Sequence, residues 1–214
     1  MSSSISDRCN LRVLKATIKN IRIAANMVKK GGVIVYPTDT VYGLGCNPLN
    51  EEAVKQVFKV KGERNKPLPI LACSIKDAEK IAKFSQIAKK IAGRLWPGPL
   101  TMVLPKKSIL PSIVTCNQDS VGVRVPNHNV ALQLICQSNG ILVGTSANKS
   151  GQKPPITAEE AIEQVGSEVD IVLNGGLCQL KVSSTVVDLT SEKPQILRTG
   201  PISLQEILSI IEKA

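Results

Sequence analysis

The sequence predicts a single α/β domain in which helices flank a mixed β-sheet. Short apolar runs bounded by glycine or proline, which are typical of buried strands, alternate with segments whose apolar residues have helical spacing. Their order along the chain is irregular, which favours a mixed sheet over a doubly wound parallel fold. With 214 residues and no internal repeat or low-complexity linker, the chain suits one large domain.

Helices are predicted where apolar residues recur at helical spacing. The first covers residues 15–30 and ends at Gly31. Asn50, a preferred N-cap residue, directly precedes the second helix, at 51–60. Asp77 begins a short helix, and Ser85 begins another. Further helices are expected at 129–138, 157–164 and 203–213.

Strands are predicted where β-branched and other apolar residues form short runs. The strand 32–36 leads into the polar turn Thr38-Asp39-Thr40, which two glycines soon follow. The turn Trp96-Pro97-Gly98-Pro99 is rigid, because each proline fixes its own backbone and constrains the residue before it. The remaining strands are expected at 68–74, 100–104, 121–125, 141–143, 169–173, 183–189 and 194–198.

Composition and charge narrow the function classes. No apolar run is long enough for a membrane helix and no secretory signal is visible, so we expect a cytoplasmic protein without membrane contact. Residues 1–107 hold 20 Lys+Arg against 7 Asp+Glu, a balance of +13, whereas residues 108–214 hold 7 against 10, a balance of −3. A basic surface suits a nucleotide, pyrophosphate, RNA or an acidic partner, although solvated helix faces also carry lysines. With so few aromatic residues, an RNA contact would be mainly electrostatic.

Cysteine and histidine usage argues against a metal centre. The six cysteines are spread along the chain, and His128 is the only histidine. Tetrahedral zinc sites draw on closely spaced ligand pairs, so we predict no metal ligands and reduced thiols. His128 precedes a predicted helix, where capping or packing is favoured over the role of a base.

Polar residues gather at the ends of several predicted strands, although no phosphate-binding loop or dinucleotide signature is present. They include Thr38, Asp39, Thr40, Lys59, Lys61, Arg64, Lys66, Arg124, Ser146, Asn148, Ser183, Ser184 and Arg198. Each alone is also explained by a helix cap, a turn or a solvated lysine. Together they offer cations, hydroxyls and amides without a general base. Such a set suits phosphoryl or nucleotidyl transfer, which depends mainly on positioning and electrostatics.

Eight stretches of the chain, taken in order, resemble the YrdC/Sua5/TsaC family of threonylcarbamoyl-AMP synthases. They are Tyr36–Gly45, Phe58–Gly62, Lys66–Leu68, Leu95–Thr101, Val121–Pro126, Thr145–Gly151, Ser184–Leu189 and Ile196–Gly200. The chain resembles the short, single-domain form, with residues 1–14 as a polar leader and 15–214 as the YrdC-like domain. The family fold is an α/β domain with a twisted mixed sheet and a basic concave face.

The resemblance implies a nucleotidyltransferase that makes threonylcarbamoyl-AMP and pyrophosphate from L-threonine, bicarbonate and ATP, with Mg²⁺ accompanying the ATP. A separate threonylcarbamoyl transferase complex would use the product to form N6-threonylcarbamoyladenosine at position 37 of tRNA. The basic face would suit a contact with tRNA or double-stranded RNA.

The resemblance also implies roles for individual residues, with Lys61 and Arg64 as the catalytic pair. L-threonine would be bound by Thr40, Arg124, Ser146 and Ser184, with Arg124 on its carboxylate. ATP would be bound by Lys61, Arg64, Lys66, Ser120, Asn148, Ile156 and Arg198. The loop 61–68 is one residue shorter than the family pattern and has Glu63 where an arginine is expected. The resemblance then implies that Arg64 would take that role.

Two other functions stay open from the sequence. One is a non-catalytic module that grips RNA by shape and phosphate contacts. The other is a related domain that makes a carbamoyl-adenylate for a different acceptor. Arg124 and Arg198 at strand ends discriminate against the RNA-binding module, which does not need them.

Overall fold

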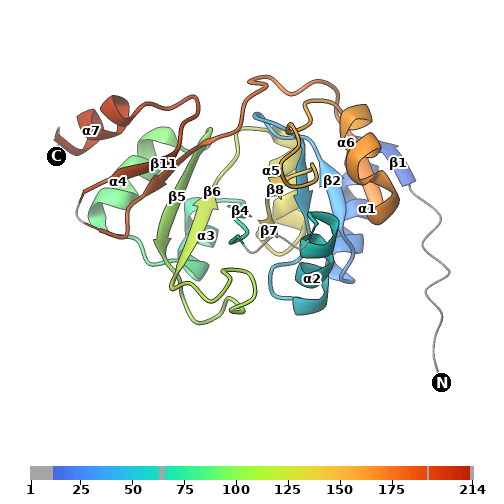
Figure 1. Ribbon diagram of the computed structural model, residues 1–214, viewed down its shortest axis with the longest axis horizontal. Coiled ribbons are helices and arrows are strands. Elements are labelled where there is room, and N and C mark those ends of the chain that lie inside the picture. Colours follow the sequence, from blue (N-terminus) through green and yellow to red (C-terminus); the bar gives the residue numbers. More distant parts are fainter. Residues whose placement is uncertain (1–11, 63–65, 192, 213–214) are drawn as a thin grey trace.

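The strands form two mixed sheets (Figure 1), and the computed structural model describes residues 12–62, 66–191 and 193–212. The first sheet has the order β1 (Arg12–Lys15), β9 (Ile171–Asn174), β2 (Ile34–Tyr36), β3 (Gly43–Gly45) and β8 (Thr145–Ser146). The second has the order β11 (Gln195–Arg198), β10 (Thr185–Asp188), β5 (Leu100–Pro105), β6 (Ser120–Arg124), β4 (Ile70–Ala72) and β7 (Ile141–Val143). Each sheet combines parallel and antiparallel pairs. The mixed α/β class is confirmed, whereas the expectation of one sheet is wrong.

The helices begin at polar caps. They are α1 (Ile18–Lys29), α2 (Glu51–Val60), α3 (Ile75–Ile81), α4 (Gln86–Leu95), α5 (Asn129–Gln137), α6 (Ala158–Val165) and α7 (Leu204–Glu212), with a 3-10 turn at Gly166–Glu168. The Asn50 side chain accepts a hydrogen bond from the Ala53 N–H, as predicted for an N-cap. His128 Nδ1 accepts from the Ala131 N–H at 3.4 Å, so the predicted capping role of His128 is confirmed.

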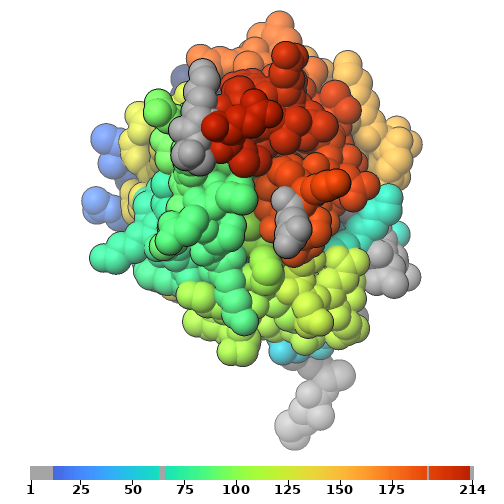
Figure 2. Space-filling view, turned by 90° about the vertical axis from the view of Figure 1, so that its left-hand side faces the viewer, coloured from blue at the N-terminus to red at the C-terminus, as the bar shows by residue number. Residues whose placement is uncertain are grey.

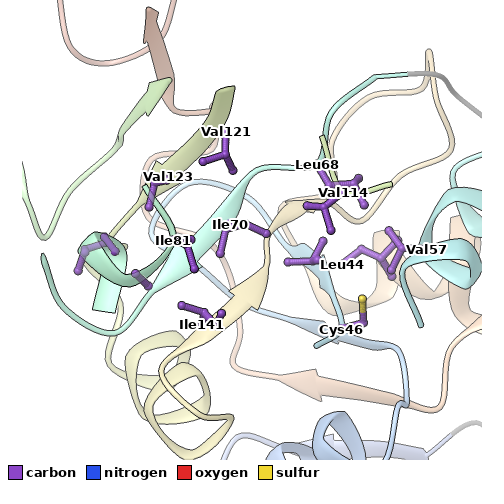
Figure 3. Packing of buried hydrophobic residues seen from close by; sticks show 14 of the residues in the cluster. Leu44, Cys46, Val57, Leu68, Ile70, Ile81, Val114, Val121, Val123 and Ile141 are labelled. Atoms are coloured by element: carbon purple, nitrogen blue, oxygen red, sulfur yellow. The ribbon is translucent and has the colours of Figure 1, made fainter. Parts of the chain in front are cut away.

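Two hydrophobic cores hold the sheets and helices together. Helices α1 and α5 contact each other and cover one core, to which β2, β4 and β7 contribute Ile34, Tyr36, Leu71 and Leu142. The other core joins both sheets: Figure 3 shows Leu44 and Cys46 near Val57 of α2 and across from Ile70 of β4. On the face seen in Figure 2, the C-terminal segments lie over the region of α4, which contacts α7.

The two sheets meet at a corner formed by Gly144, the single residue between β7 and β8. Its N–H donates to the Pro69 carbonyl at 2.8 Å, and the preceding Val143 N–H donates to the Cys46 carbonyl at 3.0 Å. A Cβ at position 144 would lie 2.3 Å from Leu71 Cγ, so the close approach of the backbone to β4 requires glycine. The chain therefore crosses from one sheet to the other within one residue.

Two further features differ from the sequence-based expectations. Residues 12–14, assigned to the polar leader, begin β1, which pairs in parallel with β9. Cys73 and Cys136 form a disulfide, so the prediction of reduced thiols is wrong for this pair. Helix α5 packs against β4 and brings their Cα atoms to 5.1 Å, within disulfide range, across a sequence separation of 63. Among the described residues, no helix has the length and apolarity needed to cross a bilayer.

Candidate active site

A cavity of about 440 Å³ opens at the corner between the two sheets. The strand-end turns of the first sheet form one wall, with Thr38, Thr40 and Ser146. The second sheet forms the floor through alternate residues of three strands, because side chains two apart share a face. These floor residues are Thr101 and Val103 of β5, Ser120, Gly122 and Arg124 of β6, and Val186 and Asp188 of β10.

Arg124 is the centre of this site and is held from three sides. Its Nε donates to the Gly98 carbonyl at 2.8 Å, its Nη1 donates to Thr40 Oγ1 at 2.9 Å, and its Nη2 pairs with Asp39 Oδ1. The residue is only 4% exposed, and burial lowers the pKa of the guanidinium while Asp39 opposes that shift. A guanidinium has five N–H groups, so one on each terminal nitrogen has no acceptor among the described residues.

The two threonines of the Thr38-Asp39-Thr40 turn form a directed chain of hydrogen bonds. Thr38 Oγ1 donates to the Val41 carbonyl at 2.6 Å, so the Thr40 hydroxyl must supply the proton of its 3.0 Å bond to Thr38 Oγ1. Thr40 Oγ1 in turn accepts from Arg124. The hydroxyl of Thr40 has therefore used its proton, and one of its lone pairs has no donor among the described residues and suits an N–H group of a ligand.

A second polar chain lies on the side of β10 and β11. Arg198 donates from Nε and Nη2 to the Ser184 carbonyl at 3.0 and 2.9 Å, and from Nη2 to Ser184 Oγ at 3.0 Å. Ser184 Oγ also shares a 2.9 Å hydrogen bond with Thr101 Oγ1. All three residues line the cavity, so Arg198 holds the Ser184 hydroxyl in place while facing the same space.

Lys61 and Asn148 shape the wall from behind. Lys61 is 1% exposed, and its Nζ donates to the carbonyls of Ser146 and Asn148 at 2.6 Å each. Asn148 is 5% exposed, and its Nδ2 donates to the Lys149 and Gln152 carbonyls at 2.7 and 2.8 Å. These bonds fix the turn that follows β8, and with it the position of Ser146.

The structure brings most of the predicted site residues into this one cavity. All four residues assigned to L-threonine line it, and so do Lys66, Ser120 and Arg198 from the nucleotide set. Lys61, Asn148 and Ile156 are not among the lining residues. Both backbone groups of Ile156 have partners, since its N–H donates to Glu160 Oε2 at 2.7 Å and its carbonyl accepts from Cys178 at 2.9 Å. Arg64 lies outside the described residues.

Thr101 and Asp188 also line the cavity and were not picked out from the sequence. Each is a polar residue at an inward-facing position of a predicted strand, and that pattern is the signal that could have found them. Asp188 is the one acidic side chain among the described lining residues, against the three cations Lys66, Arg124 and Arg198. These three cations suit a ligand with carboxylate or phosphate groups.

Known proteins resemble this chain over most of its length. The Sua5/YciO/YrdC family model, described as Telomere recombination, matches residues 26–200. The chain belongs to this family. It is 42% identical over 193 residues to the threonylcarbamoyl-AMP synthase of Pyrococcus abyssi, a match that covers 89% of this chain and 57% of the relative. It is 37% identical to a putative threonylcarbamoyl-AMP synthase of Methanocaldococcus jannaschii, covering 84% of this chain and 85% of the relative.

Solved structures of the family also match. The crystal structure of P. abyssi Sua5 complexed with L-threonine has a TM-score of 0.90 and 39% identity, and the match covers 94% of this chain and 61% of that one. The chain thus spans little more than half of the P. abyssi protein but most of the M. jannaschii relative.

Proposed function

We propose that this chain is a threonylcarbamoyl-AMP synthase that uses L-threonine, bicarbonate and ATP. One observation carries the proposal: Thr40, Arg124, Ser146, Ser184 and Arg198 come from strand ends in both sheets and line the same cavity. Its volume of about 440 Å³ lies in the range of small-molecule sites. The P. abyssi relative is named a threonylcarbamoyl-AMP synthase, and the M. jannaschii relative is named a putative one. The P. abyssi protein has been crystallised with L-threonine.

The amino acid would lie at the Arg124 end of the cavity. The two remaining N–H groups of Arg124, one on each terminal nitrogen, suit a carboxylate with its two oxygens. The lone pair left on Thr40 Oγ1 suits the amino group of the same molecule. A carboxylate only accepts hydrogen bonds and an ammonium group only donates them. The Arg124 donors and the Thr40 acceptor therefore allow the amino acid to bind in one orientation.

The nucleotide would lie along the rest of the cavity, beside Lys66, Ser120 and Arg198. In the reaction, the amine of threonine bonds to the carbon of bicarbonate with loss of water, and an oxygen of the resulting carbamate bonds to the α-phosphorus as pyrophosphate leaves. Both steps need close placement of two polar reactants, and the second needs charge compensation at phosphorus. Lys66 and Arg198 supply that compensation, while Lys61 holds the wall that carries Ser146.

The residues present also fit the Mg²⁺ expected with ATP. Protein-bound Mg²⁺ on nucleotides usually takes one or two carboxylates together with the phosphates. Asp188 lines the cavity, and its Oδ1 accepts from the backbone N–H and hydroxyl of Thr190, while its Oδ2 has no hydrogen-bond partner among the described residues. Asp188 would hold the ion through Oδ2, and the ion would supply charge neutralisation at the phosphates. No group of three or more metal-binding side chains occurs in the part of the chain that the structure describes.

A contact with RNA is a second part of the proposal, together with delivery of the product to a threonylcarbamoyl transferase complex. The N-terminal half carries the whole excess of positive charge, with a balance of +13 over residues 1–107. Such a surface, including the expected basic concave face, favours phosphate contacts with tRNA that weaken as salt rises. Binding of tRNA that did not change between low and high salt would contradict this part alone.

The activity is tested by incubating the purified protein with ATP, Mg²⁺, bicarbonate and L-threonine and measuring pyrophosphate. We expect pyrophosphate release that requires both threonine and bicarbonate, with threonylcarbamoyl-AMP detected by mass spectrometry. Omission of either substrate is the control. Pyrophosphate release that is independent of threonine, or its absence altogether, would contradict the proposed function.

A further inference from the structure

We infer that Asp39 is a positioning residue for the reaction: it acts on L-threonine only through Arg124, by setting the plane of the guanidinium. The inference rests on the proposed function. Asp39 belongs to the turn after β2 in the first sheet, and Arg124 ends β6 in the second. Their ion pair therefore joins the two sheets directly behind the cavity.

The side chain of Asp39 has no other visible task. Asp39 is 2% exposed, and among the described residues Arg124 is the single hydrogen-bond partner of its carboxylate. Asp39 Oδ2 is buried and has no hydrogen-bond partner within residues 12–62, 66–191 and 193–212. The turn itself is built by Thr38, whose Oγ1 binds the N–H groups of Thr40 and Val41 and the carbonyl of Val41. A buried carboxylate without a structural hydrogen bond is costly, so its pairing with Arg124 is the feature that accounts for it.

Asp39 also lies out of reach of a ligand. Thr38, Thr40 and Arg124 line the cavity, whereas Asp39, between the two threonines, does not. The carboxylate thus sits behind the guanidinium and does not line the cavity. It can influence a bound molecule only through the cation in front of it.

The pair determines which N–H groups Arg124 presents. Thr40 and Asp39 each occupy one N–H on a different terminal nitrogen, while Gly98 occupies Nε. With all three acceptors in place, the guanidinium cannot rotate, and the two unused N–H groups keep one direction. Without the Asp39 charge, the hydrogen bond from Nη2 loses its charge assistance, and charge-assisted hydrogen bonds are about twice as strong as neutral ones.

Asp39→Asn tests the inference, since it keeps the size of the side chain and removes the charge. We expect the KM for threonine to rise about 10- to 100-fold, the range of one charged hydrogen bond, with the KM for ATP unchanged. Calorimetric titration of threonine should show the same loss of affinity. Asp170→Asn is the matched control, because Asp170 Oδ2 only accepts the Val33 N–H at 2.8 Å, away from the cavity lining.

A double-mutant cycle separates positioning from a structural role. If Asp39 acts through Arg124, Asp39→Asn should cause no further loss of threonine affinity in an Arg124→Gln background. A purely structural role would lower the melting temperature and leave the KM for threonine unchanged, and that result would overturn the inference. If Asp39→Asn does not fold, Asp39→Glu, which keeps the charge but displaces it by one methylene, should raise the KM for threonine in the same way. Wild-type protein without threonine-dependent pyrophosphate release would instead refute the proposed function.

Discussion

Replacing Arg124 by lysine probes the amino-acid end of the cavity while keeping a positive charge beside Asp39. A lysine ammonium has three N–H donors, and Arg124 already serves three acceptors: the Gly98 carbonyl, Thr40 Oγ1 and Asp39 Oδ1. A lysine that keeps these partners has no donor left for a substrate carboxylate. Arg124→Lys therefore removes the two N–H groups of the guanidinium that are left to bind a substrate carboxylate.

The magnitude follows from that count. A hydrogen bond to a charged group is worth about 1.5–3 kcal/mol, so two of them set a loss of at least about 3 kcal/mol, or roughly 100-fold in kcat/KM for threonine. The assay is threonine-dependent pyrophosphate release, with the KM for ATP measured in parallel and expected to stay constant. Arg22→Lys, at an exposed position on α1, is the matched control. A threonine kcat/KM within threefold of the wild-type value would refute the assignment of Arg124 to the carboxylate.

Three further predictions concern stability. Lys61→Met should lower the free energy of unfolding by about 2–4 kcal/mol, because it leaves two carbonyls without their charged donor; an unchanged denaturation midpoint would contradict this. Burial raises the pKa of the Cys46 thiol from 9.0 to about 12, so the folded state keeps a proton that the unfolded chain loses. The free energy of unfolding should therefore fall by about 1.4 kcal/mol per pH unit between pH 9.0 and about pH 12. Cys46→Ala should make this pH dependence shallower, and a slope identical to that of the wild type would refute the reasoning. Reduction of the Cys73–Cys136 disulfide, whose cysteines are 63 residues apart, should cost about 4 kcal/mol on the loop-entropy scale. A Cys73→Ser/Cys136→Ser double variant should not respond to reductant, and a wild-type melting temperature that is insensitive to reductant would count against the bond.

The sequence predicted the local features well, because each has a local physical cause. Asn50 is followed by an acidic, apolar helix and caps it, and His128 caps α5. The convergence of Thr40, Arg124 and Ser146 in one cavity was expected from the family resemblance, whereas their origin in two different sheets was not.

What the sequence could not show depends on contacts between distant segments. The division into two sheets depends on the corner at Gly144, where the backbone lies close to Leu71 of β4. A glycine in the sequence shows only that such a close approach is allowed. The disulfide joins residues far apart in the chain, and nothing in the spacing of Cys73 and Cys136 indicates it. Lys61 Nζ donates to the Ser146 and Asn148 carbonyls, contacts that only the folded wall creates.

The most direct measurement is a crystal structure of the protein with L-threonine and a non-hydrolysable ATP analogue bound together. The account predicts both molecules in the cavity between the sheets, with the threonine carboxylate on the terminal nitrogens of Arg124 and the phosphates beside Lys66 and Arg198. Threonine found elsewhere on the molecule, or in the cavity without contact to Arg124, would contradict it.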